Sequence, residues 1–161
     1  MKAEPVVAQT PVWDAIRQAM DLTLVALAGE QAGAAQRCLS ETVEYAKTRI
    51  QFGRAIGSLQ AVKHMAADLL LETESAISAA RNAAARLAED ADDATEAVSL
   101  AAFACADAFV TTAATSIQMH GGIGMTDEFD IGFFIKRSAV AEQTFANVTF
   151  PRTRYGQLGG Y

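Results

Sequence analysis

A stripe of apolar residues at helical spacing covers the first third of the chain and limits what it can fold into. Its members follow one another at intervals of three, four or seven residues: Trp13, Ile16, Met20, Leu24, Leu27, Ala34, Cys38 and Tyr45. Such intervals place side chains on one face of an α-helix. Thr10 and Pro11 suit the start of that helix, because a hydroxyl caps unpaired amides and proline is tolerated in the first turn. We predict that the helix extends to about Gln51 and that Gly53 ends it as a left-handed C-cap.

Two more long helices follow with the same spacing. We predict that Ser58 opens the second, whose inward face is Leu59, Val62, Ala66, Leu69, Thr73, Ala76, Ala80, Ala84 and Leu87. The acidic run 89–93 indicates a solvated turn, and Asp93 with Glu96 forms a capping box for the third helix. The inward face of the third helix is Val98, Ala101, Cys105, Ala108, Thr112 and Thr115. We expect this helix to end at Gly121-Gly122.

A fourth, shorter helix is predicted after Thr126, with Phe129, Phe133 and Val140 facing inward. The tail that follows is ambiguous, because Pro151 interrupts a helix there. No alternation typical of strands occurs. The sequence therefore predicts an all-α fold, an antiparallel up-down four-helix bundle, with residues 1–10 as an irregular lead and 11–161 as a single domain.

The composition agrees with a helical bundle and excludes some partners. A chain of 161 residues is long enough for a core, and its 51% apolar share is largely alanine with only 7% aromatic residues. Alanine-rich cores suit closely packed helices. The net charge of −6 argues against nucleic acid, since no basic stripe is present to neutralise phosphates. A small anionic ligand needs only a few local cations and stays open.

Cysteines, apolar runs and the N-terminus give three further expectations. Cys38 and Cys105 lie in apolar helical stretches without metal-type spacing, so we predict buried reduced thiols and no metal site. The run 97–117 is apolar enough to suggest a membrane span, but it contains Asp107 and several hydroxyl residues, so we predict a buried bundle helix instead. Residues 1–10 lack the apolar centre of a signal peptide, and we expect a cytoplasmic protein.

Two segments punctuated by glycine combine residue types that suit ligand binding. The segment 49–60 places Arg49, Phe52 and Gln60 around a sharp turn, where arginine can pair with phosphate and phenylalanine offers a flat apolar face. An ordinary helix–helix corner with a surface arginine explains it equally well. The segment 118–124 begins with Gln118 and contains three glycines, which let a backbone approach a ligand closely. It follows a helix and not a strand, so the Rossmann fingerprint is excluded, while a simple C-cap is not.

Taken together and in this order, the two segments resemble the paired signature of the acyl-CoA dehydrogenase C-terminal domain. The resemblance covers residues 20–145 and includes Ala28-Gly29 and 33–36 on the first helix. The stretch from Gly122 to Glu128, continued by 132–134 and Lys136-Arg137, is similar to the small-subunit type of bacterial heteromeric acyl-CoA dehydrogenases.

The resemblance implies a flavoenzyme that forms a trans-2 double bond in an acyl-CoA thioester and passes electrons to an electron-transfer flavoprotein. In the family, a base removes the α proton while the β hydrogen leaves as hydride to the flavin. Residues matching Arg49, Phe52 and Gln60 contact FAD bound mainly by a neighbouring subunit, and those matching Gln118 and Gly121-Gly122 approach its adenosine diphosphate portion. The FAD site thus spans a subunit interface in a homo- or hetero-oligomer. An arginine with exposed glycine amides is a physically sound pyrophosphate site.

The sequence departs from the family at the catalytic base. The usual carboxylate position falls on Ala146, and an alternative position on the first helix falls near Leu22, beside Thr23, where the family often has an arginine for CoA. Neither Ala146 nor Leu22 can accept a proton. Glu142, about one helical turn before Ala146, is a candidate base if the register slips, and otherwise a surface or interface carboxylate. Asp21 is a second candidate base. The alternative is that the acid at this position only binds CoA or the backbone.

Three hypotheses follow. The chain completes the FAD site of an acyl-CoA dehydrogenase without being an autonomous catalyst, because the domains that hold most of the flavin and substrate precede this one in the family. Alternatively, it is a non-catalytic assembly subunit, as the missing bases suggest. The third alternative is a helical bundle with an interaction function only. We expect the first, with His120 either touching the cofactor or satisfying helix carbonyls.

Overall fold

The computed structural model describes residues 10–144 and 147–160, and the side chains from Val12 onward. Its elements are helices α1 (Thr10–Thr48), α2 (Gln60–Ala88), α3 (Ala94–His120), α4 (Ile131–Gln143) and α5 (Thr149–Leu158), two short strands β1 (Ile50–Gln51) and β2 (Arg54–Ala55), and the 3₁₀ segments η1 (Ile56–Ser58) and η2 (Gly121–Met125). The all-α prediction is confirmed. Of the predicted irregular lead, residues 1–9 lie outside the described residues, and Thr10 already belongs to α1.

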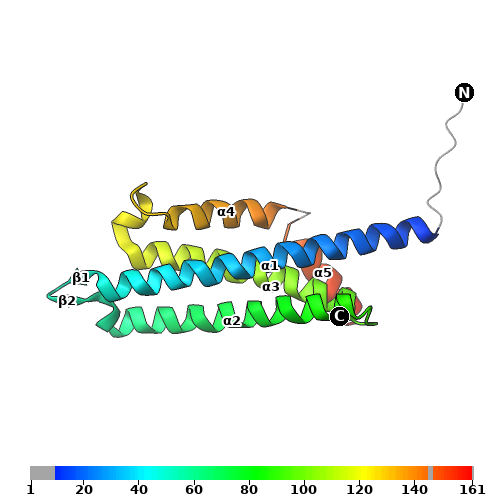
Figure 1. Ribbon diagram of the computed structural model, residues 1–161, viewed down its shortest axis with the longest axis horizontal. Helices are drawn as coiled ribbons and strands as arrows, with labels where there is room; N and C mark the ends of the chain where they lie inside the picture. Colours follow the sequence, from blue (N-terminus) through cyan, green and yellow to red (C-terminus); the bar gives the residue numbers. More distant parts are fainter. Residues whose placement is uncertain (1–9, 145–146, 161) are drawn as a thin grey trace, which may run out of the picture.

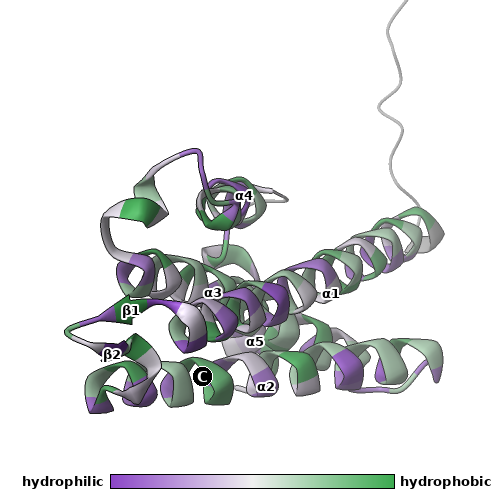
Figure 2. Cartoon of the chain, turned by 60° about the vertical axis from the view of Figure 1, so that its left-hand side comes forward, coloured by the Kyte–Doolittle hydropathy of each residue, from purple (hydrophilic) through white to green (hydrophobic). Residues whose placement is uncertain are grey.

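Helices α1 to α4 alternate in direction, as expected for an up-down bundle (Figure 1). Helices α1 and α3 form the central pair, α2 lies on one side of it and α4 on the other (Figures 1 and 2). Helix α5 packs against α3 at the end opposite the hairpin. The described chain thus has a fifth helix that the sequence left ambiguous. Pro151 lies in the first turn of α5 and is buried, where its missing amide costs nothing.

Helix α3 lies at the centre of the core. Its neighbours are α1, α2, α4 and α5, and small side chains let them approach closely. Ala28, Ala83, Ala101 and Ala113 are fully buried. Among the described residues, the segment Ala94–Met125 alone is long and apolar enough to cross a membrane, yet 61% of its most apolar window is buried inside the bundle. Burial among four other helices accounts for its apolar composition.

Both thiols are buried and free, as predicted. Desolvation is the main reason that the pKa of Cys38 rises to about 11 and that of Cys105 to about 12. The Cys105 thiol donates a hydrogen bond to the carbonyl oxygen of Ala76, 3.3 Å away, which ties α3 to α2. These cysteines belong to the packing of the core.

The predicted end of the first helix is wrong by three residues. Helix α1 stops at Thr48, and β1 and β2 then form a hairpin in which Ile50 pairs with Ala55. Phe52 and Gly53 have φ of 54° and 75°, the two consecutive positive values of a type I′ turn. Gly53 does adopt the left-handed conformation, but in the tip of a hairpin and not as a helix cap. Strands of two residues are too short to produce a period-2 pattern.

Two predicted caps are also wrong. The N-cap of α2 is Leu59, because Ser58 lies in η1 and its hydroxyl donates to the Ala55 carbonyl oxygen at 2.7 Å. Asp93 is the N-cap of α3 but makes no capping hydrogen bond. Its carboxylate accepts one from Arg86 at 2.8 Å, so an ion pair across the acidic turn replaces the capping box.

The inward face of the fourth helix differs from the prediction. Phe129, Phe133 and Val140 are 38%, 63% and 56% exposed. The buried positions of α4 are Ile131, Ser138 and Ala141. Phe134 and Ile135 are partly buried on the same face, so α4 packs through a different face from the one predicted.

The N-terminal part of the apolar stripe is also exposed. Trp13, Ile16 and Met20 are 55%, 45% and 40% exposed, whereas Leu24 is 3% exposed. Helix α1 has 39 residues and α3 has 27, so α1 continues past the end of its neighbours (Figure 1). A helix that outlasts its partners has nothing against which to bury its first turns.

Candidate functional site

The residues predicted to bind the cofactor all come from elements at one end of the bundle. Arg49 follows α1, Phe52 is in the hairpin tip, Gln60 begins α2, Gln118 is in the last turn of α3, and Gly121-Gly122 begin η2. The hairpin and η2 both lie at the left end in Figure 1. The topology therefore brings together segments that are far apart in sequence, because α1 and α3 run in the same direction and end side by side.

A hydrogen-bonded contact ties these two ends. The Tyr45 hydroxyl donates to the carbonyl oxygen of His120 at 3.3 Å, and the rings of Tyr45 and His120 stack with centroids 4.2 Å apart. Tyr45 lies one helical turn before Arg49, whose amide donates to the Tyr45 carbonyl at 2.8 Å. His120 directly precedes Gly121. Arg49 and the glycine turn are thus close enough for a single elongated ligand to reach both.

The tip of the hairpin presents Phe52 to solvent. Its side chain is 89% exposed, and its φ of 54° is a conformation that bulky residues rarely adopt. Asparagine, aspartate or glycine would fit this position of a type I′ turn with less strain. Phe52 therefore lowers the stability of the fold and gains no packing within the described chain. Residues that bind ligands commonly have this property.

The glycines after α3 have different roles. Gly121 has a φ of 68°, which favours glycine, and a Cβ added at Gly121 or Gly122 would have nothing within 4 Å. Both backbone units therefore face open space. Gly124 is buried, and a Cβ there would lie 3.0 Å from the Ile117 carbonyl oxygen. The third glycine thus serves the packing of η2 on α3, and the first two have open space beside them. The Gly121 amide already donates to the carbonyl oxygens of Ile117 and Gln118.

The six predicted residues share one end but not one pocket. Arg49 and His120 line a groove of ≈ 820 Å³ between α1 and the segment joining η2 to α4. Gln118 lines a different groove of ≈ 550 Å³ between α2 and α3. The Gln60 amide lies 2.9 Å from His64 on the next turn of α2. A ligand that touched all of these groups would have to extend across the end of the bundle.

The His120 side chain bonds to a carbonyl oxygen of its own helix, which is one of the two roles predicted for it. It is 6% exposed, and its Nδ1 lies 2.8 Å from the Ser116 carbonyl oxygen. Phe129 packs edge-on against both Tyr45 and His120. This aromatic cluster joins α1, α3 and the start of α4.

The candidate bases are placed differently from one another. Asp21 is 4% exposed, and its carboxylate accepts from Arg154 at 2.5 Å and from Thr95 at 3.0 Å. It therefore ties α1 to α5 and α3, and both of its oxygens have partners. Leu22 is 61% exposed.

Glu142 is half-buried in α4. It lines a small crevice of ≈ 20 Å³ together with Gln31, Thr144 and Asn147. The Ala146 position lies outside the described residues. The described residues contain no group of three or more metal-binding side chains.

Sequence reasoning missed several groove residues. Tyr45 was predicted as part of the core stripe, Glu128 was named only as the end of the stretch that resembles the small-subunit type, and Asp130 was not singled out. Their meeting depends on the path of η2, which returns the chain to α1. No signal in the sequence specifies that path.

Comparison with known proteins identifies the domain. Residues 13–143 match the family described as "Acyl-CoA dehydrogenase, C-terminal domain". The chain is 48% identical over 118 residues to acyl-CoA dehydrogenase IpdE2 of Mycobacterium tuberculosis, a match that covers 73% of this chain and 35% of that protein. It therefore spans about a third of that relative's length.

Solved structures have the same fold. The crystal structure of the ChsE4-ChsE5 complex from Mycobacterium tuberculosis contains a chain that matches with a TM-score of 0.82 at 31% identity, covering 94% of this chain and 40% of that one. Butyryl-CoA dehydrogenase from Megasphaera elsdenii matches with a TM-score of 0.86 at 20% identity, covering 91% of this chain and 38% of that one, and shows the fold alone. From the family match and these relatives, the chain belongs to the acyl-CoA dehydrogenase family, and its helical bundle is the C-terminal domain of that family.

Proposed function

We propose that this chain completes the FAD site of an acyl-CoA dehydrogenase-type enzyme across a subunit interface. The reaction is the α,β-dehydrogenation of an acyl-CoA thioester, with an electron-transfer flavoprotein as the electron acceptor. The single observation that carries the proposal is that Arg49 and the open backbone at Gly121-Gly122 lie at the same end of the bundle, where Tyr45 contacts His120. Bound FAD would supply the hydride acceptor for this chemistry.

The chemistry of these groups fits an elongated dianion with aromatic ends. Arg49 is exposed and makes no ion pair with a described residue. Its guanidinium can therefore hold a phosphate with two parallel hydrogen bonds. The Gly121 amide already donates to the carbonyl oxygens of Ile117 and Gln118, so the Gly122 amide is the main-chain donor that we assign to the phosphate. Phe52 offers an apolar face to a ring. Arg49 and Phe52 are both exposed, which suits a cofactor held mainly by a neighbour.

We infer that the chain contributes to the site without supplying the base. The two family positions for the base fall on Leu22 and Ala146, and neither side chain binds a proton. Asp21 already has two hydrogen-bond partners. The reduced thiols suit the bacterial cytoplasm, which is the location we propose.

A second candidate function is a non-catalytic assembly subunit. It is favoured by the exposed apolar side chains of Trp13, Ile16 and Met20, which share one face of α1 and are 55%, 45% and 40% exposed. Neighbouring apolar side chains on an exposed surface mark protein–protein contacts. The relative of known structure with 31% identity is itself part of a two-protein complex.

Flavin content separates the two functions. The chain would be co-expressed with a dehydrogenase subunit, and FAD would be measured by absorbance in the purified complex. Arg49→Ala removes a charged hydrogen-bond donor worth about 1.5–3 kcal/mol, so FAD should bind about 10- to 100-fold more weakly. Arg81→Ala is the matched control, because Arg81 is exposed on α2 far from the hairpin. Unchanged flavin content together with an altered oligomeric state would favour the assembly function.

A further inference from the structure

The groove beside Arg49 also contains carboxylates, which repel a cofactor phosphate because both groups are negatively charged acceptors. We call it the acidic groove, and its lining is Arg37, Ser40, Glu41, Glu44, Tyr45, Thr48, Arg49, His120, Glu128, Phe129, Asp130 and Ile131. One wall is the C-terminal half of α1, and the other is the segment that joins η2 to α4. Its volume of ≈ 820 Å³ is enough for several side chains.

Negative charge exceeds positive charge in the acidic groove. Its lining has four carboxylates and two guanidinium groups. Glu41 already pairs with Arg37 at 2.5 Å, and Glu44 pairs with Lys47 at 2.6 Å. Glu128 and Asp130 make no ion pair with any described residue. The wall formed by Glu128 and Asp130 is therefore uncompensated.

His120 adds a further acceptor to the lining of the groove. Its Nδ1 donates to the Ser116 carbonyl oxygen at 2.8 Å, because a carbonyl can only accept. In the neutral ring the Nε2 atom is then an acceptor. The side chain is 6% exposed, it lines the groove, and Nε2 has no hydrogen bond to a described residue. Among the described residues, Ser116 Oγ is the one side-chain oxygen or nitrogen that is both fully buried and without a hydrogen-bond partner, so Nε2 is not fully enclosed. Nε2 is therefore open to a donor from outside the chain.

From these observations, we propose that the acidic groove receives an arginine side chain from the partner subunit of the complex proposed above. A guanidinium has five donors in a plane and no acceptor, which matches a lining of carboxylates and an imidazole acceptor. It also stacks on aromatic rings, and Tyr45 and Phe129 line the same groove. The inference rests on the proposed function, because that function already places a second subunit at this end of the bundle.

The arginine would also serve the cofactor half-site. Glu128 and Asp130 line the same groove as Arg49, so they would repel a phosphate held by Arg49. An arginine side chain between these carboxylates and the phosphate removes that repulsion. Binding of the partner and binding of the anionic cofactor would then favour each other.

The first test uses the whole chain and a small probe. N-acetyl-arginine amide would be titrated in an NMR experiment, with N-acetyl-citrulline amide as its neutral counterpart. Saturable shifts of the Tyr45, His120 and Phe129 ring signals are expected with the arginine compound only. Glu128→Gln with Asp130→Asn should weaken binding by at least about threefold, since each removes one exposed charge contact.

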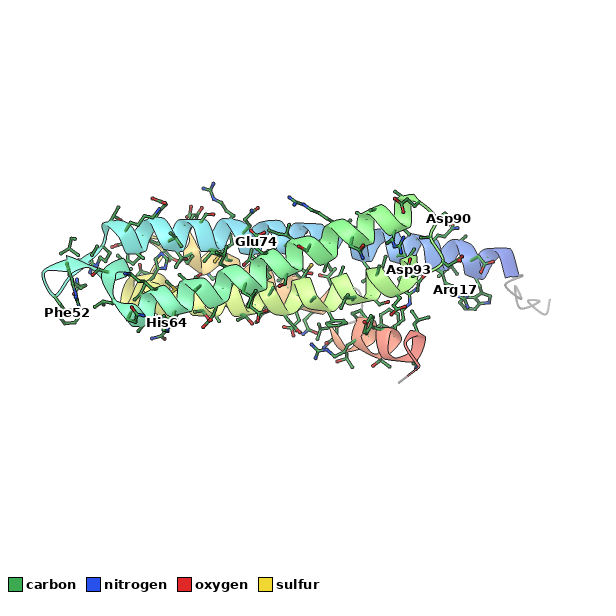
Figure 3. All side chains as sticks on the ribbon, turned by 90° about the horizontal axis from the view of Figure 1, so that it is seen from below. Arg17, Phe52, His64, Glu74, Asp90 and Asp93 are labelled. Atoms are coloured by element: carbon green, nitrogen blue, oxygen red, sulfur yellow. The ribbon has the colours of Figure 1, made fainter. Side chains whose placement is uncertain are left out.

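The control removes the same charge elsewhere. Glu74→Gln with Asp90→Asn changes two exposed carboxylates that lie away from the hairpin end, as Figure 3 shows. This variant should bind the probe like the unmodified chain. If both variants bind the probe equally weakly, the binding is only a general attraction between a cation and an acidic chain, and the proposed arginine site is overturned. Equal binding of the citrulline compound, or no saturable shift, would overturn it as well.

The second test identifies the source of the arginine. With the dehydrogenase subunit, Glu128→Gln/Asp130→Asn should raise the dissociation constant of the complex by a similar factor, and Glu74→Gln/Asp90→Asn should not. If the probe binds but the complex is unaffected, the arginine does not come from the partner and the assignment fails. Loss of FAD in the Arg49→Ala variant is a separate readout. The proposed function can therefore fail while the probe still binds, and the arginine site can fail while FAD binding still depends on Arg49.

Discussion

Replacement of Asp21 by alanine tests how much the buried ion pair between α1 and α5 stabilises the fold. The Asp21 and Arg154 side chains are 6% and 16% exposed and lie 2.5 Å apart. Removing one member of a buried pair leaves an uncompensated charge and costs about 3–5 kcal/mol. Because part of the Arg154 side chain reaches solvent, we expect the lower end, about 3 kcal/mol. That is a large share of the roughly 5–15 kcal/mol that stabilises a typical domain.

The chain contains a matched control for this change. Arg137 and Glu30 also join a C-terminal helix to α1, with two hydrogen bonds of 2.6 and 2.8 Å, but their side chains are 47% and 46% exposed. Glu30→Ala should therefore cost only about 0–1 kcal/mol. Asp21→Ala combined with Arg154→Met should recover much of the loss, because no charge is then left buried.

Urea unfolding followed by far-UV circular dichroism measures all of these variants. Tryptophan fluorescence is a poorer probe, because Trp13 is 55% exposed in the folded chain. The midpoint should fall strongly for Asp21→Ala and little for Glu30→Ala at an unchanged denaturant slope. If the two variants lose the same free energy of unfolding, burial is not what gives the Asp21 pair its strength, and the reasoning is refuted.

Three further outcomes are expected. The hydrogen bond from Arg137 lowers the pKa of Glu30, so this pair stabilises the fold above the unfolded-state pKa and the effect is lost as pH falls through the folded value. The Glu30→Gln variant should therefore be as stable as the unmodified chain near pH 3 and slightly less stable near pH 7. A variant that is less stable at pH 3 than at pH 7, relative to the unmodified chain, would contradict this linkage. Because burial raises the pKa of Cys38 to about 11 and of Cys105 to about 12, neither should react with a thiol reagent at pH 8 until urea unfolds the chain, so rapid labelling of the native chain would refute the burial. Phe52→Asn should stabilise the isolated chain by about 0.5–1 kcal/mol in urea unfolding, because asparagine fits a positive φ better, and should lower FAD content in the complex; loss of stability would mean that the turn is not strained.

The sequence was sufficient to predict the helices and the end that holds the predicted site. Intervals of three and four residues predicted α1 to α4, and Gly121-Gly122 correctly marked the end of α3. Arg49 and the glycine turn lie at the same end of the bundle because α1 and α3 run in the same direction, which follows from an up-down order of helices. Connectivity and helix length therefore determined the placement.

Other features depend on contacts that no local pattern encodes. Helix α4 has apolar residues on two faces, and the buried face proved to be the one with Ser138 and Ala141, not the one with Phe133 and Val140. That buried face also holds Ile131, so the size of the side chains does not predict which face of α4 is buried. The acidic groove likewise arises from the path of η2, which the sequence does not specify.

The structure of the complex with FAD would test the central claim most directly. Determined by cryo-electron microscopy or crystallography with the dehydrogenase subunit, it should show the Arg49 guanidinium and the Gly122 amide at hydrogen-bond distance, about 2.7–3.2 Å, from the cofactor's pyrophosphate. A pyrophosphate bound wholly by the other subunit, with Arg49 facing solvent, would contradict the account.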